Sequence, residues 1–182
     1  MSDSPTYLGF RHKEHSPGVN LFTLRDTTFK TTTLKMYFIS DLGPDATQVA
    51  LLPYLLRRGT KRHPTLLDLS RALEHLYGTH LSVDVSKLVE WHTVSFRLNI
   101  VADRYVPGRR SLLEPAAKIL GELVNDPVLQ DEAFLPDYLK QEKRSLKNHI
   151  ESLINEKAQY AVERLIQTMC ANEAYRHSEY GK

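Results

Sequence analysis

The chain has 182 residues, a length that fits one domain or one domain with part of a second. Hydrophobic residues make up 41% and charged residues 25% of the sequence, which is ordinary for a soluble globular protein and gives no reason to expect disorder outside the chain ends. The formal net charge of +2 gives no reason to expect a nucleic-acid ligand. No apolar run approaches the ~20 residues of a membrane-spanning helix, so no membrane partner is expected.

The single cysteine, Cys170, has no second thiol with which to form an internal disulfide, so a reducing compartment is expected. The first residues lack the basic segment and apolar run of a signal peptide, which favours a cytoplasmic protein. Cys170 follows an amphipathic run and has no accompanying histidine motif. We therefore interpret it as a small packed side chain rather than a nucleophile.

The first quarter of the chain predicts a tail followed by two strands. Residues 1–18 are mostly polar and contain Pro5, Pro17 and Gly18, so we expect an irregular N-terminal tail. Residues 20–25 and 31–40 have the composition of strands, and the second alternates apolar and polar side chains. The turn-like residues 26–28 between them predict a hairpin.

Paired helices and paired strands then alternate along the chain. A helix is expected from Asp45 to Gly59, whose glycine suits a left-handed helix end, and a second helix over 66–77. Strands are expected over 80–88 and 91–101, and a helix over 112–124. The rest is mostly helical from residue 135 to 169, with a break near 154–155. This order predicts an α+β fold: a two-layer sandwich of a mixed or antiparallel sheet with helices on one face.

The string L-L-P-Y-L-L-R-R-G-T, residues 51–60, resembles the helix H-F-L-E-H-M-x-F-K-G-T of pitrilysin/insulinase-type (inverzincin) metallopeptidases. Further segments agree with that family in order and spacing: L-E-H-L-Y-G at 73–78, V-N-D-P at 124–127, F-L-P-D-Y-L-K-Q-E-K-R-S-L at 134–146, and the tyrosine, histidine and tyrosine-glycine of 175–181. The resemblance covers about residues 19–181. It implies one pitrilysin-like domain over 19–182, similar to the mitochondrial processing peptidase and truncated at its C-terminal end.

The catalytic pattern of the family is H-x-x-E-H, in which two histidines bind zinc and the glutamate activates water. Positions i, i+3 and i+4 lie on one face of a helix, so these groups converge on one metal ion. A glutamate on a later helix is the third ligand. When the family pattern is aligned on Gly59 and on Glu142, the four degenerate motif positions here are Ala50, Pro53, Tyr54 and His149.

These four residues do not supply the family's chemistry. Alanine has no ligand atom, proline has no base, and a tyrosine phenol with a pKa near ~10 rarely binds zinc. His149 is one potential ligand where a catalytic zinc needs three. Pro53 also costs a helix interior ~3 kcal/mol and favours a kink. The resemblance therefore implies no catalytic, cofactor-binding or metal residues and no cofactor.

The chain resembles the non-catalytic members of the family, whose bacterial examples include short proteins paired with an H-x-x-E-H neighbour. This implies a subunit that binds peptide or partners an active zinc peptidase subunit, with self-association as another form of pairing. Two alternatives stay open. The first is an active zinc metalloendopeptidase whose site is misaligned here, which would need zinc as its cofactor. The second is an unrelated α+β interaction scaffold.

Other histidines give weaker patterns. H-K-E-H at 12–15 is one residue shorter than the family motif and has no helical face, so we interpret it as a surface segment. His80 and His92 fall on adjacent predicted strands and could face each other, but two histidines do not make a catalytic zinc site. The basic residues between Arg57 and Arg62 have no interleaved aromatic residues and are interpreted as a solvated loop.

Overall fold

The computed structural model describes residues 9–181. The chain divides into two compact units, Met1–Lys30 and Thr31–Lys182. Within the described part, no helix is both long and apolar enough to cross a membrane.

The small unit is an antiparallel hairpin of β1 (Arg11–Ser16) and β2 (Val19–Thr23). The chain reverses at Gly18, whose φ of +79° suits a residue without a side chain. Across the pair, the His12 ring stacks on Phe22 at a centroid distance of 4.7 Å, and its Nε2 lies 2.7 Å from the Asn20 Oδ1. These cross-strand contacts order a segment that composition alone describes as polar.

Two predictions are therefore wrong. Residues 11–16 are a strand rather than part of a tail, whereas residues 1–8 lie outside the described chain. The predicted hairpin between 20–25 and 31–40 does not form, because β2 pairs with β1 and the next strand pairs elsewhere.

The larger unit contains a three-stranded antiparallel sheet of β3 (Thr31–Asp41), β4 (His80–Leu88) and β5 (Trp91–Val101), in the order β3-β5-β4. The register is unbroken from Thr31 opposite Val101 to Asp41 opposite Trp91. The three predicted strands of this sheet are confirmed. Their alternation places one set of apolar side chains on a single face, where Phe96, Leu98 and Ile100 are at most 1% exposed.

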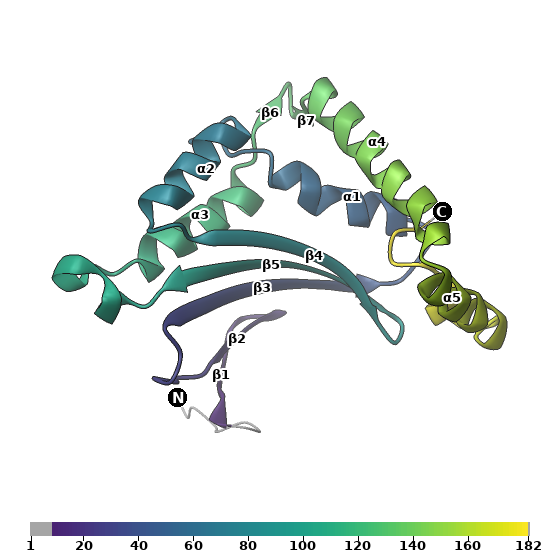
Figure 1. Cartoon of the computed structure of the whole chain (residues 1–182), viewed down its shortest axis with the longest axis horizontal. Helices are drawn as coiled ribbons and strands as arrows, with labels where there is room; N and C mark the ends of the chain where they lie inside the picture. The colour runs from purple at the N-terminus through teal and green to yellow at the C-terminus, as the bar shows by residue number, and fades with distance from the viewer. Residues whose placement is uncertain (1–8, 182) are drawn as a thin grey trace. The chain divides into compact units, whose positions relative to one another are not determined.

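Five α-helices complete the described part of the larger unit, and the first three of them cover that apolar face. They are α1 (Ala46–Leu56), α2 (Leu66–His75), α3 (Leu113–Asn125), α4 (Pro136–Ser152) and α5 (Lys157–Met169). Figure 1 shows α1, α2 and α3 on one side of the sheet. The core joins α1 and α3 to β5. The predicted α+β class is therefore confirmed.

Short elements connect these parts: η2 (Asp103–Tyr105), η3 (Pro107–Arg109), β6 (Leu129–Gln130), β7 (Ala133–Phe134), η4 (Leu153–Asn155) and η5 (Ala174–Arg176). The predicted break near 154–155 is the short helix η4.

Gly59 follows α1, but it does not have the left-handed conformation that the sequence predicted. A Cβ atom at this position would lie 2.7 Å from the carbonyl oxygen of His63 and 2.9 Å from that of Pro64. Glycine is therefore required because two backbone segments approach each other closely, not because of its φ angle.

Candidate functional site: the degenerate zinc-site helix

Helix α1 carries the first three degenerate motif positions. Ala50 is fully buried, Pro53 is buried in the helix interior and Tyr54 is half-buried. The helix continues through Pro53 to Leu56, although proline has no N–H to bond the carbonyl of Val49. The helix survives because most of its length is packed in the core rather than standing alone.

A partly buried ion pair fixes α1 against α4. The Arg58 Nε donates to the Glu142 Oε1 at 2.5 Å, and the two side chains are 22% and 11% exposed. The guanidinium also lies over the Tyr138 ring, 5.3 Å from its centroid. Tyr54 lies one turn before Arg58, and His149 lies two turns after Glu142 on the same face of α4.

Tyr180 lies between these two motif positions. Its phenol lies close enough to that of Tyr54 for each to influence the pKa of the other. Its ring meets the imidazole of His149 edge-on, with a centroid distance of 4.7 Å and an interplanar angle of 76°. The second-histidine position and the distal-glutamate position thus both contact one aromatic side chain. We call Tyr54, His149 and Tyr180 the tyrosine cluster.

Lys87 of β4 holds the segment that carries Tyr180. Its ammonium group donates to the backbone oxygens of Tyr175 at 3.2 Å and His177 at 2.9 Å. Two carboxylates lie near the same nitrogen, Glu163 at 3.7 Å and Glu179 at 3.9 Å, and the Lys87 side chain is 8% exposed. A buried ammonium with this many partners is a structural anchor.

The end of this segment packs directly on α1. A Cβ atom added to Gly181 would collide with the Thr47 Oγ1, and Gly181 has a φ of +74°. Thr47 lies one turn before Ala50 on α1. The tyrosine-glycine pair therefore closes over the degenerate helix and needs glycine at its second position.

The two phenols of the tyrosine cluster are not prepared for acid–base chemistry at neutral pH. Burial raises the pKa of Tyr180 to about 12, and burial also raises the pKa of Tyr54 although Arg57 acts in the opposite direction. Both phenols are therefore neutral hydrogen-bonding groups. No three His, Cys, Asp or Glu side chains among residues 9–181 are grouped so that they could hold a metal ion.

Sequence reasoning missed Lys87 and the role of Tyr180. The alternation of β4 places Lys87 on the same face as Val83 and Val85, which is a sign of a buried cation. Tyr180 belongs to a segment matched to the family, but its contacts join parts of the chain far apart in sequence. Spacing alone does not reveal such contacts.

The other histidines do not form a site. The suggestion that His80 and His92 face each other is wrong, because His80 pairs with Asn99 and His92 pairs with Lys87. His92 is 1% exposed, and neither ring nitrogen has a hydrogen-bond partner. Burial also raises the pKa of the Cys170 thiol, the opposite of the shift that activates a nucleophilic cysteine.

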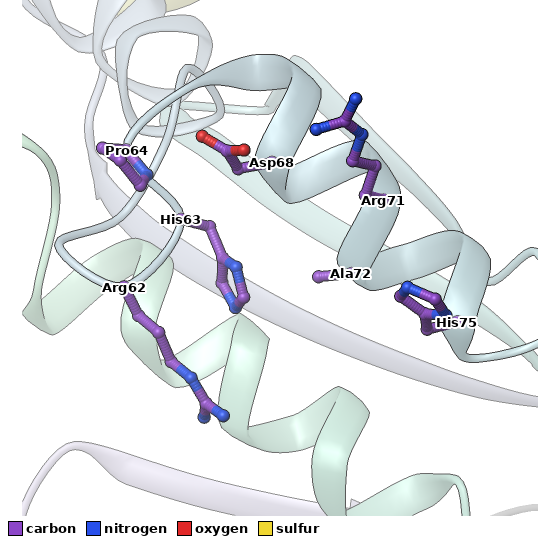
Figure 2. Close-up of a pocket in the computed structure, with 7 residues that line it drawn as sticks. All are labelled: Arg62, His63, Pro64, Asp68, Arg71, Ala72 and His75. Carbon is purple, nitrogen blue, oxygen red and sulfur yellow. The ribbon is translucent and has the colours of Figure 1, made fainter.

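A separate hollow lies between α2 and the loop before it (Figure 2). Arg62, His63 and Pro64 come from the loop, whereas Asp68, Arg71, Ala72 and His75 come from α2. Figure 2 shows the Arg71 guanidinium pointing away from His63. Arg62 and His63 instead lie 3.6 and 3.9 Å from the Glu122 carboxylate of α3. The charges of this hollow are thus not directed at one ligand position.

The fold defines a class: an α+β domain of the pitrilysin type, with packed side chains at the four positions that the motif alignment predicts. No family model matches the chain. The chain is 40% identical over 171 residues to the "Probable inactive metalloprotease YmfF" of Bacillus subtilis (strain 168). The alignment covers 93% of this chain and 40% of that protein, so the chain spans well under half of its relative.

Two solved structures agree with this assignment. A conserved protein from Enterococcus faecalis V583 is similar with a TM-score of 0.83 and 29% identity, over 91% of this chain and 39% of that one. The peptidase M16 inactive domain from Pseudomonas fluorescens matches with a TM-score of 0.66 and 20% identity, over 96% of this chain and 39% of that one, which shows a shared fold. The chain therefore belongs to the M16-like, pitrilysin-type family, and the relative that it matches at 40% identity is named as a probable inactive metalloprotease. The predicted family is confirmed, and the alternative of an unrelated scaffold is wrong.

Proposed function

We propose that this chain is part of a non-catalytic pitrilysin-like subunit that binds peptide or pairs with a zinc peptidase subunit carrying H-x-x-E-H. The observation that carries the proposal is the tyrosine cluster: Tyr180 contacts both Tyr54 and His149, where the family places zinc ligands. A neutral hydroxyl pair and an edge-on ring contact support packing there rather than water activation. In this proposal the protein acts in the cytoplasm, without a nucleic-acid or membrane ligand.

Helix α5 supports pairing with another subunit. It has no buried residue, and Glu163 on one side binds Lys87. Val162, Leu165 and Met169 recur at helical spacing and are 50%, 56% and 73% exposed. An apolar stripe of this kind on a charged helix is typical of a surface that packs against another element.

The catalytic part of the proposal is tested by metal and activity measurements on the same purified sample. We expect no stoichiometric zinc by elemental analysis and no cleavage of a mixed fluorogenic peptide library. One zinc per chain, removed by a chelator together with cleavage, would establish the alternative of an active endopeptidase with a misaligned site.

The pairing part is tested by sedimentation of the chain alone and with an H-x-x-E-H subunit from the same cell. Leu165→Glu should abolish any association because it places a charge in the apolar stripe. Leu67→Glu is the matched control, since Leu67 is similarly exposed at 57% but lies on α2. Equal behaviour of both variants would reject the α5 stripe as the surface and leave peptide binding as the proposed activity.

A further inference from the structure

The face of the β3-β5-β4 sheet that points away from the helices carries a polar hollow of about 340 Å³. Its polar lining consists of Lys35, Ser82, Asp84, Ser95 and Arg97. The strand register explains this grouping. Lys35 and Ser82 flank Arg97 in one cross-strand row, and Asp84 is opposite Ser95 in the next. The hollow lies on the opposite side of the sheet from the tyrosine cluster.

Ser95 lies at the floor of this hollow, in the central strand. It is 2% exposed, and its hydroxyl has no hydrogen-bond partner within the described chain. A buried hydroxyl without a partner costs ~1–3 kcal/mol. An unsatisfied donor at the base of a charged hollow is therefore evidence for a ligand atom that completes it.

The charged groups around Ser95 are not neutralised by the protein. Arg97 and Asp84 are exposed and make no ion pair within residues 9–181. The Lys35 ammonium lies over the Tyr37 ring, 4.3 Å from its centroid, a contact that uses none of its hydrogen-bond donors on an acceptor atom. The hollow thus combines two cationic groups, one carboxylate and two hydroxyls.

We propose that this hollow is a carboxylate-binding site, in which Arg97 and Lys35 hold the anion and Ser95 donates a hydrogen bond to it. The guanidinium fork of arginine matches the two oxygens of a carboxylate. Two positive side chains beside one negative side chain suit a ligand with a single negative charge and disfavour a doubly charged phosphate. Asp84 can accept a hydrogen bond from an N–H group of the same ligand.

The carboxylate can come from a small organic acid or from an acidic side chain of a peptide. The peptide source rests on the proposed peptide-binding function, whereas the small-acid source does not. Four probes separate these sources: a blocked five-residue alanine peptide with a central glutamate, the same peptide with glutamine, propionate, and inorganic phosphate. Binding is read from amide chemical shifts of the isotope-labelled chain.

The glutamate peptide should bind about tenfold more tightly than the glutamine peptide, as expected for one charge-assisted contact. Equal binding of propionate identifies the small-acid source, and binding of the glutamate peptide alone identifies the peptide source. Tighter binding of phosphate, or equal binding of both peptides, overturns the proposal. Cleavage of a peptide in these samples would reject the proposed function without bearing on this site.

Variants locate the site. Arg97→Gln should weaken carboxylate binding about tenfold, whereas Arg144→Gln, which removes an exposed charge from α4, should not. Ser95→Ala should weaken binding about threefold while thermal stability stays equal or rises, because it removes an unsatisfied buried hydroxyl. Unchanged affinity in Ser95→Ala, or equal losses in the two arginine variants, would overturn the proposal.

Discussion

The lysines on the two faces of the β3-β5-β4 sheet differ in their partners. On the helix-covered face, the Lys87 ammonium contacts two backbone oxygens, two carboxylates and the ring of Tyr175. On the other face, Lys35 has a ring contact but no anionic partner among the described residues, and Arg97 beside it makes no ion pair there. A cation whose partners are all supplied by the protein is a structural element. A cation in a hollow without an anionic partner is available to a ligand.

The helix-covered face also holds the elements that carry the four predicted motif positions. The helix pair, the connecting ion pair and the returning tyrosine-glycine segment are all present. Contacts of Tyr180 with Tyr54 and His149 join these elements. The helix-covered face should therefore respond to mutation through stability, and the opposite face through binding.

The largest effect is expected from Lys87→Met, which keeps most of the side-chain volume and removes the charge. The change leaves the Glu163 and Glu179 carboxylates and two backbone oxygens without their shared cation. We expect the free energy of unfolding to fall by about 2–3 kcal/mol, less than for a fully buried pair because both carboxylates are partly solvated. Urea denaturation measures this change.

Lys147→Met is the matched control for that prediction. Lys147 pairs with Glu151 one helical turn away at 3.7 Å, but the two side chains are 72% and 63% exposed. Such a pair contributes only ~0.3–0.5 kcal/mol. If both variants lose a similar free energy of unfolding, the partners around the Lys87 ammonium have no structural importance. The contrast between the two faces would then not hold.

The sheet and the helix order follow from local patterns, so the sequence predicts them well. Period-two alternation in β4 and β5 and helical spacing in α1 and α3 are properties of neighbouring residues. The first hairpin was assigned to the wrong partner strands because pairing depends on contacts such as His12 with Phe22, which no single segment encodes.

The site was only partly predictable for the same reason. Ala50, Pro53, Tyr54 and His149 were located by their spacing from a family motif. Tyr180 reaches Tyr54 and His149 because Lys87 holds its segment and because Gly181 packs closely on Thr47. These contacts join residues far apart in the sequence. The orphaned hydroxyl of Ser95 has no signal in the sequence, because serine on a polar strand face is ordinary.

A smaller effect is expected from the hydroxyl pair of the tyrosine cluster. Tyr54→Phe and Tyr180→Phe should each lower the free energy of unfolding by about 1 kcal/mol, and the double variant should cost less than the sum. Additive losses would show that the two hydroxyls do not interact.

The same pair predicts an alkaline pH dependence. Because the pKa of Tyr180 is raised to about 12, the folded protein holds its proton more firmly than the unfolded chain does. This contribution is complete below pH ~10, the unfolded pKa of tyrosine, and is lost as the pH rises towards 12. Tyr180→Phe should remove this decline relative to the wild-type chain, as measured by urea midpoints across that range.

The smallest effect is expected at His92, the exception on the helix-covered face because its buried ring nitrogens make no hydrogen bond of good geometry. Burial lowers its pKa, although the backbone of Glu179 and the charges of Glu179 and Asp45 act in the opposite direction, and Lys87 is its cross-strand neighbour. A lowered histidine pKa stabilises the fold above the unfolded value of ~6.5, and this stabilisation is lost as the pH falls.

His92→Leu should change the free energy of unfolding by less than about 1 kcal/mol at pH 7, since an unpaired imidazole contributes little beyond its packing. It should also lose less stability than the wild-type chain between pH 7 and pH 5. If the variant is instead strongly destabilised at pH 7, His92 has a polar partner in the folded protein. Every buried polar side chain discussed on the helix-covered face would then have a partner.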